Sequence, residues 1–156
     1  DRMGEMYRKI TDGKLCHLRD YKIGPCHACD YCKEINIGEC IQRDDMAPLY
    51  KDIRECDTIA IFSPVYWWQV SAQAKLFIDR LYALQKEDLE GKKLVVVVNG
   101  EEKDGDKEYQ VLNSAFLMMA DYLKMDLRFL GLGTDGEESW KDKEKWVEEF
   151  LQSTLN

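Results

Sequence analysis

The sequence predicts an α/β fold in which a doubly wound parallel sheet is covered by helices on both faces. Strand-like and helix-like segments alternate along the chain, and residues 93–98 (Lys-Leu-Val-Val-Val-Val) are apolar almost throughout. A continuous apolar run of this kind is typical of a strand buried on both faces of a parallel sheet. Because strands that alternate with helices form βαβ units, we expect crossover helices between the strands.

Four segments have strand-like composition, namely residues 14–19, 57–62, 93–98 and 125–130. Four further segments carry apolar side chains at helical spacing, which predicts amphipathic helices whose methionines and aromatic residues belong to the core. Their apolar positions are Leu49, Ile53 and Cys56; Val70, Ala74, Phe77, Ile78 and Leu81; Leu112, Phe116, Met119 and Leu123; and Val147, Phe150 and Leu151.

Size and charge limit the classes of function. A chain of 156 residues is long enough for one domain with a substantial core, and its formal net charge of −8 argues against nucleic acid or an anionic membrane as a partner. The longest apolar run is far shorter than a membrane span, and the sequence shows no signal peptide. We therefore expect a cytoplasmic protein with free thiols.

The most informative feature is a group of four closely spaced cysteines. Cys26, Cys29 and Cys32 are separated by two residues each, and Cys40 follows after seven more. A looping backbone can turn such thiolates inward around a metal ion or an iron-sulfur cluster. Gly38 gives the backbone the freedom to bring the fourth cysteine back to the other three. The spacing therefore predicts a metal or redox site.

Several interpretations of this group remain open at this point: an iron-sulfur cluster, a zinc site, bare thiols and disulfides. Cys16 and Cys56 lie in strand-like and helix-like contexts far from the group, so we exclude them from the ligand set. His17 and His27 are spare candidate ligands, although we expect exposed loop histidines at both positions. The spacing also differs from the common bacterial ferredoxin pattern, because Ile41 rather than proline follows the last cysteine.

Two segments predict a binding site at the sheet edge, because ligands of doubly wound sheets bind beyond the carboxyl ends of the strands. We expect two turns to converge there on a planar ligand, with aromatic side chains offering flat faces to it. The first consists of Ser63, Pro64, Val65, Tyr66, Trp67 and Trp68, and the second of Asn99 and Gly100. A hydrophobic lid or a dimer contact is the alternative for the aromatic segment.

Other polar residues indicate structural roles. We interpret Asp44 and Asp45 as caps of a helix that begins near residue 48. Arg80, Asp79 and Lys75 are expected to form an ion network on one helix. No arrangement of residues indicates acid-base catalysis, so we assign no catalytic side chain.

Residues 131–136 match the pattern Gly-x-Gly-x-x-Gly after a strand. The dinucleotide-binding fingerprint also requires a second strand that carries a ribose-binding acid, and too few residues follow for one. We therefore interpret this segment as a flexible turn.

Together these motifs resemble a known family. Their order and spacing resemble those of the flavodoxin-like NADPH-dependent FMN reductases, and within them of the iron-sulfur flavoproteins. The motifs that carry the resemblance are the three cysteines spaced by two residues, the fourth cysteine, Asp44-Asp45-Met46, the segment 63–67, and Ser71-Ala72-Gln73-Ala74-Lys75 with Phe77-Ile78-Asp79-Arg80. The match is close over residues 16–80 and loose afterwards.

The resemblance implies a flavodoxin-like sheet with FMN at the strand ends. It implies that the segments 63–68 and 99–100 lie on either side of the isoalloxazine ring, and that Cys26, Cys29, Cys32 and Cys40 ligate a four-iron four-sulfur cluster. Relatives with similar cysteines need not hold a cluster. The phosphate of FMN is held in this family by a first strand and loop that the residues here do not show, so we expect residues 1–156 to be one N-terminally incomplete domain, with residues 25–46 as a cysteine-rich insertion.

Two classes of function follow. The first is an FMN-dependent oxidoreductase or electron-transfer flavoprotein, with NAD(P)H or a small redox protein as donor, a small-molecule or redox-protein acceptor, and a homo-oligomeric assembly. The second is a non-enzymatic module in which the thiolates bind zinc and the aromatic segment is a protein interface. An absorption spectrum separates the two classes, because flavin and iron-sulfur clusters absorb visible light and zinc does not.

Overall fold

The computed structural model describes residues 2–134 and 136–156, and it describes no side chains for residues 136–138. Its sheet has the strand order β2-β1-β3-β4, in which β1 (Thr58–Tyr66), β3 (Lys93–Gly100) and β4 (Asp126–Gly133) are parallel. The short β2 (Gln69–Val70) is antiparallel to the end of β1. The helices are α1 (Arg2–Thr11), α2 (Tyr31–Glu34), α3 (Met46–Glu55), α4 (Ala72–Arg80), α5 (Lys107–Leu123) and α6 (Gly136–Ser153).

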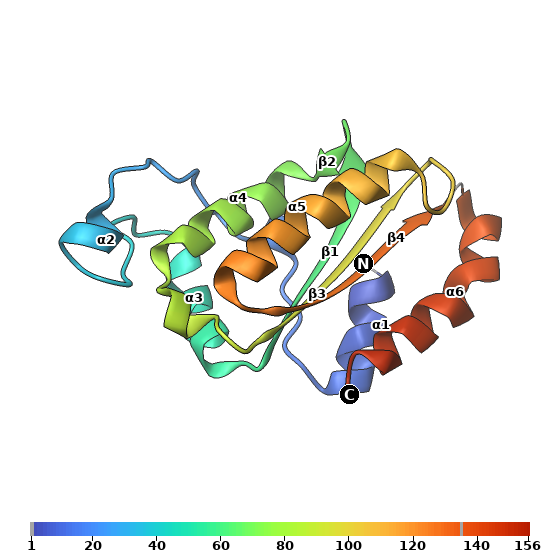
Figure 1. The fold of residues 1–156 in the computed structure, drawn as a ribbon, viewed down its shortest axis with the longest axis horizontal. Helices are drawn as coiled ribbons and strands as arrows, with labels where there is room; N and C mark the ends of the chain where they lie inside the picture. The colour runs from blue at the N-terminus through green and yellow to red at the C-terminus, as the bar shows by residue number, and fades with distance from the viewer. Residues whose placement is uncertain (1, 135) are drawn as a thin grey trace.

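Helices cover both faces of the sheet, as the sequence predicts (Figure 1). Leu94, Val96 and Val98 of β3 pack in one cluster with α3, α4 and α5, and Val95 and Val97 pack in a second cluster with α1 and α6. Because successive side chains of a strand point to opposite faces, a strand between two helix layers must be apolar at every position. The apolar run of residues 93–98 therefore marks the centre of the molecule.

The predicted strand at residues 14–19 is wrong. Residues 12–17 have no regular structure, and a single 3-10 turn follows at Leu18–Asp20. The apolar side chains of this segment instead pack against the helical core, and Lys14 pairs with Asp52 of α3 at 2.5 Å. Short alternating patterns of this kind are satisfied by packing alone when no neighbouring strand forms a ladder with them.

The predicted turns at residues 63–68 and 99–100 are largely strand. β1 continues to Tyr66, where Val65 and Tyr66 pair with β2, so that only Trp67 and Trp68 form the hairpin turn. Residues 99–100 end β3 and pair with the last residues of β4. Proline and Asn-Gly are typical of turns, but here Pro64, Asn99 and Gly100 all lie within paired strand ends.

The predicted turn at residues 131–136 is also partly strand, since Gly131 and Gly133 belong to β4, and residue 135 lies outside the described residues. Both glycines allow close packing. A Cβ atom on Gly131 would lie 2.5 Å from Cβ of Tyr109 in α5, and one on Gly133 would lie 1.9 Å from the carbonyl oxygen of Glu102. These two glycines therefore let α5 and the segment after β3 approach the sheet.

Among the residues that the structure describes, no helix is both long enough and apolar enough to cross a membrane.

We predict that Leu112→Ala lowers the free energy of unfolding by about 2 to 5 kcal/mol, because Leu112 is 1% exposed in the cluster between α5 and the sheet. Leu117→Ala on the same helix is the matched control, since Leu117 is 48% exposed and its loss should change stability by no more than about 0.5 kcal/mol. Urea denaturation of both variants measures the difference. Equal losses of unfolding free energy in the two variants would contradict the assignment of Leu112 to the core.

Candidate functional site

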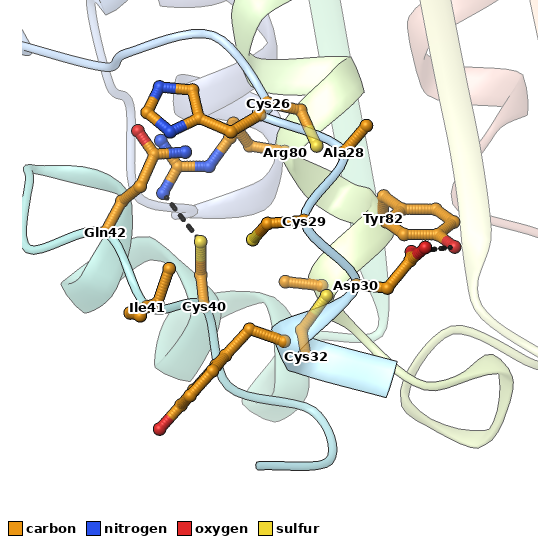
Figure 2. A pocket seen from close by; sticks show the side chains of 13 residues that line it. Cys26, Ala28, Cys29, Asp30, Cys32, Cys40, Ile41, Gln42, Arg80 and Tyr82 are labelled. Carbon is orange, nitrogen blue, oxygen red and sulfur yellow. Dashed lines mark hydrogen bonds between the residues drawn. The ribbon is translucent and has the colours of Figure 1, made fainter. Parts of the chain in front are cut away.

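The four clustered cysteines line one hollow at the end of the molecule where the loop carrying α2 projects (Figures 1 and 2). The hollow has a volume of ≈ 330 Å³ and is bounded on its inner side by Arg80 and by Tyr82, which follows α4. Its cysteines are Cys26, Cys29, Cys32 and Cys40. Cys16 and Cys56 do not line it.

The backbone of the cysteine loop turns sharply because three of its residues adopt left-handed conformations. Ala28 and Asp30 have φ of 49° and 52°, and Gly38 has φ of 83°. The N–H of Gly38 donates to the carbonyl oxygen of Cys32 at 3.0 Å, so the chain reverses after α2 and returns Cys40 to the hollow. Positive φ is uncommon for residues other than glycine, and its energetic cost is tolerated where the surroundings fix it.

Side-chain contacts hold this loop against the segment after α4. The hydroxyl of Tyr82 donates to Oδ1 of Asp30 at 3.0 Å, and Nζ of Lys33 lies 4.9 Å from the centre of the Tyr82 ring. The same Lys33 ammonium donates to the carbonyl oxygen of Leu84 at 2.8 Å. The loop is thereby attached at the residue before α2 and within α2 itself, and the hollow keeps a defined wall.

The donor set of four cysteine sulfurs fits an iron-sulfur cluster, and the same donor set also serves structural zinc sites. All four cysteines are free thiols; Cys26 and Cys29 are exposed, and Cys32 is buried, which raises the pKa of its thiol. Among the described side chains, those of residues 2–134 and 139–156, no three Cys, His, Asp or Glu residues form a group that could hold one metal ion.

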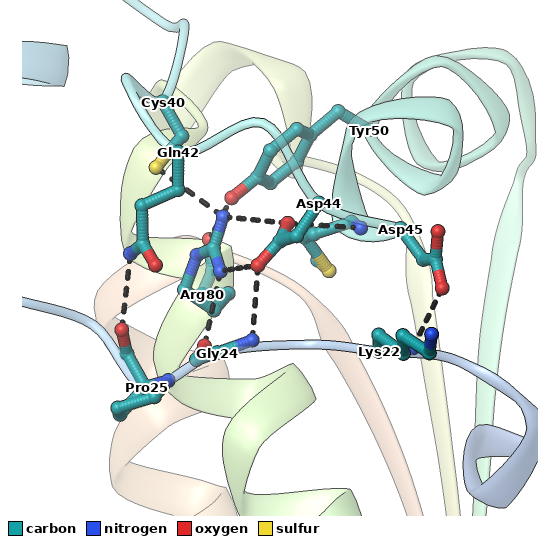
Figure 3. A network of polar contacts seen from close by, with 10 residues as sticks. Lys22, Gly24, Pro25, Cys40, Gln42, Asp44, Asp45, Tyr50 and Arg80 are labelled. Carbon is teal, nitrogen blue, oxygen red and sulfur yellow. Dashed lines mark hydrogen bonds and ion pairs between the residues drawn. The ribbon is translucent and has the colours of Figure 1, made fainter.

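Arg80 is buried at the wall of the hollow (Figure 2), and its polar contacts form a network (Figure 3). Its guanidinium group forms a bidentate pair with Asp44, with Nη1 2.5 Å from Oδ2 and Nη2 3.1 Å from Oδ1. Nη1 also donates to the carbonyl oxygen of Gly24 at 3.0 Å, and Nη2 donates to Sγ of Cys40 at 3.3 Å. The two segments that flank the cysteine loop and the end of α4 therefore meet at one side chain.

This arrangement corrects two interpretations of the sequence. Arg80 is not part of an ion network on its own helix, because Lys75 and Asp79 pair only with each other at 2.6 Å and Arg80 points inward to Asp44. Asp44 does accept from the N–H of Met46 at 3.2 Å, as a cap would, but Asp45 accepts from the N–H of Lys22 instead. Sequence spacing along one helix could not reveal a pair formed across 36 residues.

The protonation states of this network follow from its contacts. Burial would raise the pKa of Asp44, but hydrogen bonds from Arg80, from the N–H of Gly24 and from the N–H of Met46 together lower it. Tyr50 donates its hydroxyl hydrogen to the carbonyl oxygen of Arg80 at 2.9 Å, and its burial raises the pKa of that hydroxyl to about 12. At neutral pH the network therefore holds one fixed ion pair.

A second hollow, of ≈ 460 Å³ and widely open, lies where β1 and β3 end side by side. Its lining consists of Val65, Trp67, Trp68, Glu101, Glu102 and Glu108. The predicted residues Val65, Trp67 and Trp68 thus reach this hollow, and the three glutamates were missed. The signal available in the sequence was the acidic run immediately after Gly100, at the same edge of the sheet.

The remaining predicted residues, namely Ser63, Pro64, Tyr66, Asn99 and Gly100, do not line this hollow. Oγ of the buried Ser63 accepts from the N–H of Ser71 at 2.9 Å, which ties β1 to the start of α4. The side-chain amide of Asn99 donates to Oγ1 of Thr134 at 3.0 Å, and the carbonyl oxygen of Gly100 accepts from the N–H of Thr134. These residues stabilise the edge of the sheet from which the hollow is built.

Glu108 has an unusual environment among the residues that line this second hollow. It is 8% exposed, and its Oε1 is buried without a hydrogen-bond partner among the described residues. That oxygen would lie 2.5 Å from a Cβ atom on Gly100, so only glycine fits beneath it. A buried acceptor that lacks a donor indicates a place where a ligand or a water molecule supplies one.

The hairpin turn at this hollow is strained. Trp67 and Trp68 both have positive φ, 49° and 59°, in a two-residue turn where Asn-Gly is the favoured sequence. Their rings are 87% and 60% exposed and touch at a centroid distance of 5.9 Å. The two exposed indole rings meet edge to face at an interplanar angle of 63° and give the hollow an aromatic rim.

Comparison with known proteins assigns the family. The model of the NADPH-dependent FMN reductase family matches residues 3–126. The chain belongs to this family.

An iron-sulfur flavoprotein of Archaeoglobus fulgidus is 45% identical over 65 residues, which cover 42% of this chain and 29% of that protein. A second iron-sulfur flavoprotein of the same organism is 36% identical over 101 residues, which cover 63% of this chain and 51% of that protein. The chain thus spans about half or less of the length of these relatives.

The solved structures matched include an FMN-dependent NADH-azoreductase from Bacillus anthracis in complex with FMN, with a TM-score of 0.64 at 14% identity over 99% of this chain and 88% of that one. At this identity the likeness shows the fold alone, and the predicted flavodoxin-like α/β fold is confirmed.

We predict that Trp68→Gly raises the free energy of unfolding by about 1 kcal/mol relative to Trp68→Ala, because both variants lose the indole ring and only glycine relieves the positive φ. Chemical denaturation of the two variants measures this difference. If Trp68→Ala were equally stable, the turn would carry no strain at this position.

We predict that Asp44→Asn destabilises the protein by about 3 to 5 kcal/mol at neutral pH, because it leaves the Arg80 charge buried without its counterion. The pKa of Asp44 is lowered in the folded state, so its stabilisation is present above the unfolded pKa of about 4 and is lost as the pH falls through the folded value. The difference in the free energy of unfolding between wild type and Asp44→Asn should therefore narrow only below about pH 4.

Urea denaturation between neutral and acidic pH tests this expectation, with Asp79→Asn in the exposed pair as the control. That control should change stability by no more than about 1 kcal/mol. If Asp44→Asn lost the same free energy of unfolding at every pH, Asp44 would not form an ion pair with Arg80.

Proposed function

We propose that the protein is an FMN-dependent oxidoreductase or electron-transfer flavoprotein that also holds a four-iron four-sulfur cluster. The observation that carries the proposal is the convergence of four free cysteine thiols on one hollow, in a chain of the NADPH-dependent FMN reductase family. The relatives named iron-sulfur flavoproteins support the same assignment.

The hollow at the sheet edge is the proposed position of the isoalloxazine ring. FMN, when bound, supplies transfer of a hydride or of single electrons. Trp67 and Trp68 would offer it flat apolar faces, and the unpartnered Oε1 of Glu108 would accept a hydrogen bond from a ring N–H. The lining contains three glutamates and none of its described residues is basic, so this hollow suits the uncharged ring and not the phosphate group.

The hollow at α2 is the proposed position of the cluster, with Cys26, Cys29, Cys32 and Cys40 as ligands. The left-handed residues of the loop orient the thiols, and the burial of Cys32 keeps water from one side of the site. We propose NAD(P)H or a small redox protein as electron donor, a small-molecule or redox-protein acceptor, and a homo-oligomeric, cytoplasmic protein.

Two variants should separate the two sites. In the full-length protein purified without oxygen, we expect visible flavin bands together with a broad cluster absorption. Cys29→Ala should lower the iron content sharply and leave the FMN content unchanged, whereas Trp67→Ala should weaken FMN binding and leave the iron content unchanged. Cofactor analysis by absorption spectroscopy and metal assay measures both.

Cys56→Ala is the matched control, because Cys56 is half-buried at the end of α3, where its thiol donates to the carbonyl oxygen of Ile53. This variant should retain full iron. Colourless wild-type protein that contains stoichiometric zinc would contradict the proposed function and favour a zinc-binding module. Iron loss in Cys56→Ala would show that the ligand set is wrong.

A further inference from the structure

The four terminal N–H groups of Arg80 each have one acceptor. Each terminal nitrogen of a guanidinium group carries two hydrogens. Those of Nη1 go to Asp44 and to the carbonyl oxygen of Gly24, and those of Nη2 go to Asp44 and to Sγ of Cys40. The side chain is 1% exposed, so water does not offer an alternative acceptor.

Sγ of Cys40 is a poor acceptor for the charged N–H of Arg80 if that sulfur belongs to a neutral thiol. A thiol is a weak acceptor, whereas a buried cationic donor requires strong ones. A thiolate that ligates iron keeps negative charge on sulfur and accepts a charge-assisted hydrogen bond well. The bidentate pair with Asp44 fixes the guanidinium plane, so Nη2 cannot turn its second hydrogen away from Cys40.

We propose that Arg80 is a positioning residue that raises the reduction potential of the cluster through its hydrogen bond to the Cys40 sulfur. This inference rests on the proposed function, because it requires a cluster at the four cysteines. Uptake of one electron makes the cluster more negative, so a donor aimed at a ligand sulfur stabilises the reduced form more than the oxidised form. Asp44 and Gly24 hold the donor in place before the electron arrives.

Two variants remove this hydrogen bond without changing net charge. Arg80→Lys keeps the positive charge for Asp44, but one nitrogen then replaces the two that reach Asp44 and Cys40 separately. The double variant Arg80→Met with Asp44→Leu removes the buried pair as a unit, which leaves no isolated charge behind. The double variant Lys75→Met with Asp79→Leu is the control, because it removes an exposed pair from the same helix and is equally neutral.

The reduction potential of the cluster is measured by a dithionite titration followed by electron paramagnetic resonance. For both Arg80 variants we expect the ratio of reduced to oxidised cluster at a fixed solution potential to fall about tenfold, which is about 59 mV for a one-electron couple. The control should match wild type. Unchanged potentials in Arg80 variants that retain full iron would overturn the inference and leave the proposed function intact.

A measurement on the wild-type protein does not depend on any variant folding. With ¹⁵N in the guanidinium nitrogens, pulsed electron paramagnetic resonance of the reduced cluster should show a coupling to one arginine nitrogen, because Nη2 lies 3.3 Å from Sγ of Cys40. A cluster signal without that coupling would overturn the inference even if both variants lost their iron. Wild-type protein without iron would overturn the proposed function, and the inference with it.

Discussion

The buried pair of Arg80 and Asp44 is the interaction on which the cysteine loop depends. The 19 residues between Gly24 and Asp44 contain one short helix and bury little apolar surface, since Ile35, Ile37 and Ile41 are exposed. The two residues that flank this segment bind the same guanidinium group. An isolated buried charge would strongly destabilise the protein. The pair therefore forms only when α4, the chain segment at Gly24 and the start of α3 are all in place. Folding of the loop is thereby coupled to folding of the helical layer.

Helix α4 carries this coupling from the sheet edge to the loop. Its first turn is capped by Oγ of Ser71, which accepts from the N–H of Ala74 at 3.3 Å, and the N–H of Ser71 donates to Ser63 in β1. Its last residue is Arg80. Nine helical residues rise about 13 Å, so the two hollows are held at a fixed separation by one short and rigid element. Only β2 and the cap residue Ser71 separate the hairpin turn at Trp67 and Trp68 from that helix.

The sequence predicted what depends on local pattern and missed what depends on contacts between distant segments. The apolar run 93–98 and the spacing of Leu112 and Phe116 are local signals, and both gave the correct layer. The strand at 14–19 failed because a strand requires a neighbour that local pattern cannot supply. The four cysteines were recognisable from spacing alone, whereas the partner of Arg80 lies 36 residues away and could be found only in three dimensions.

Local pattern was also insufficient to find all the residues that line the candidate flavin site. The sequence singled out Trp67 and Trp68, but Glu101 and Glu102 beside them lie on the segment that follows β3. Asp104 holds that segment against the end of β4. Oδ1 of Asp104 accepts from the N–H of Gly133 at 2.8 Å and from Lys143 of α6 at 2.7 Å. That segment follows this path only because Gly133 has no side chain, which no spacing rule would have revealed.

The two hollows differ in the charge that they would present to the proposed cofactors. Glu101 and Glu102 are exposed carboxylates at the rim of the sheet-edge hollow, where negative charge disfavours an added electron. At the cysteine hollow the donor nearest to sulfur belongs to Arg80, which favours an added electron. With FMN and a cluster in the positions proposed, these charges lower the reduction potential of the flavin and raise that of the cluster. Both shifts would favour electron transfer from the flavin to the cluster over transfer in the opposite direction.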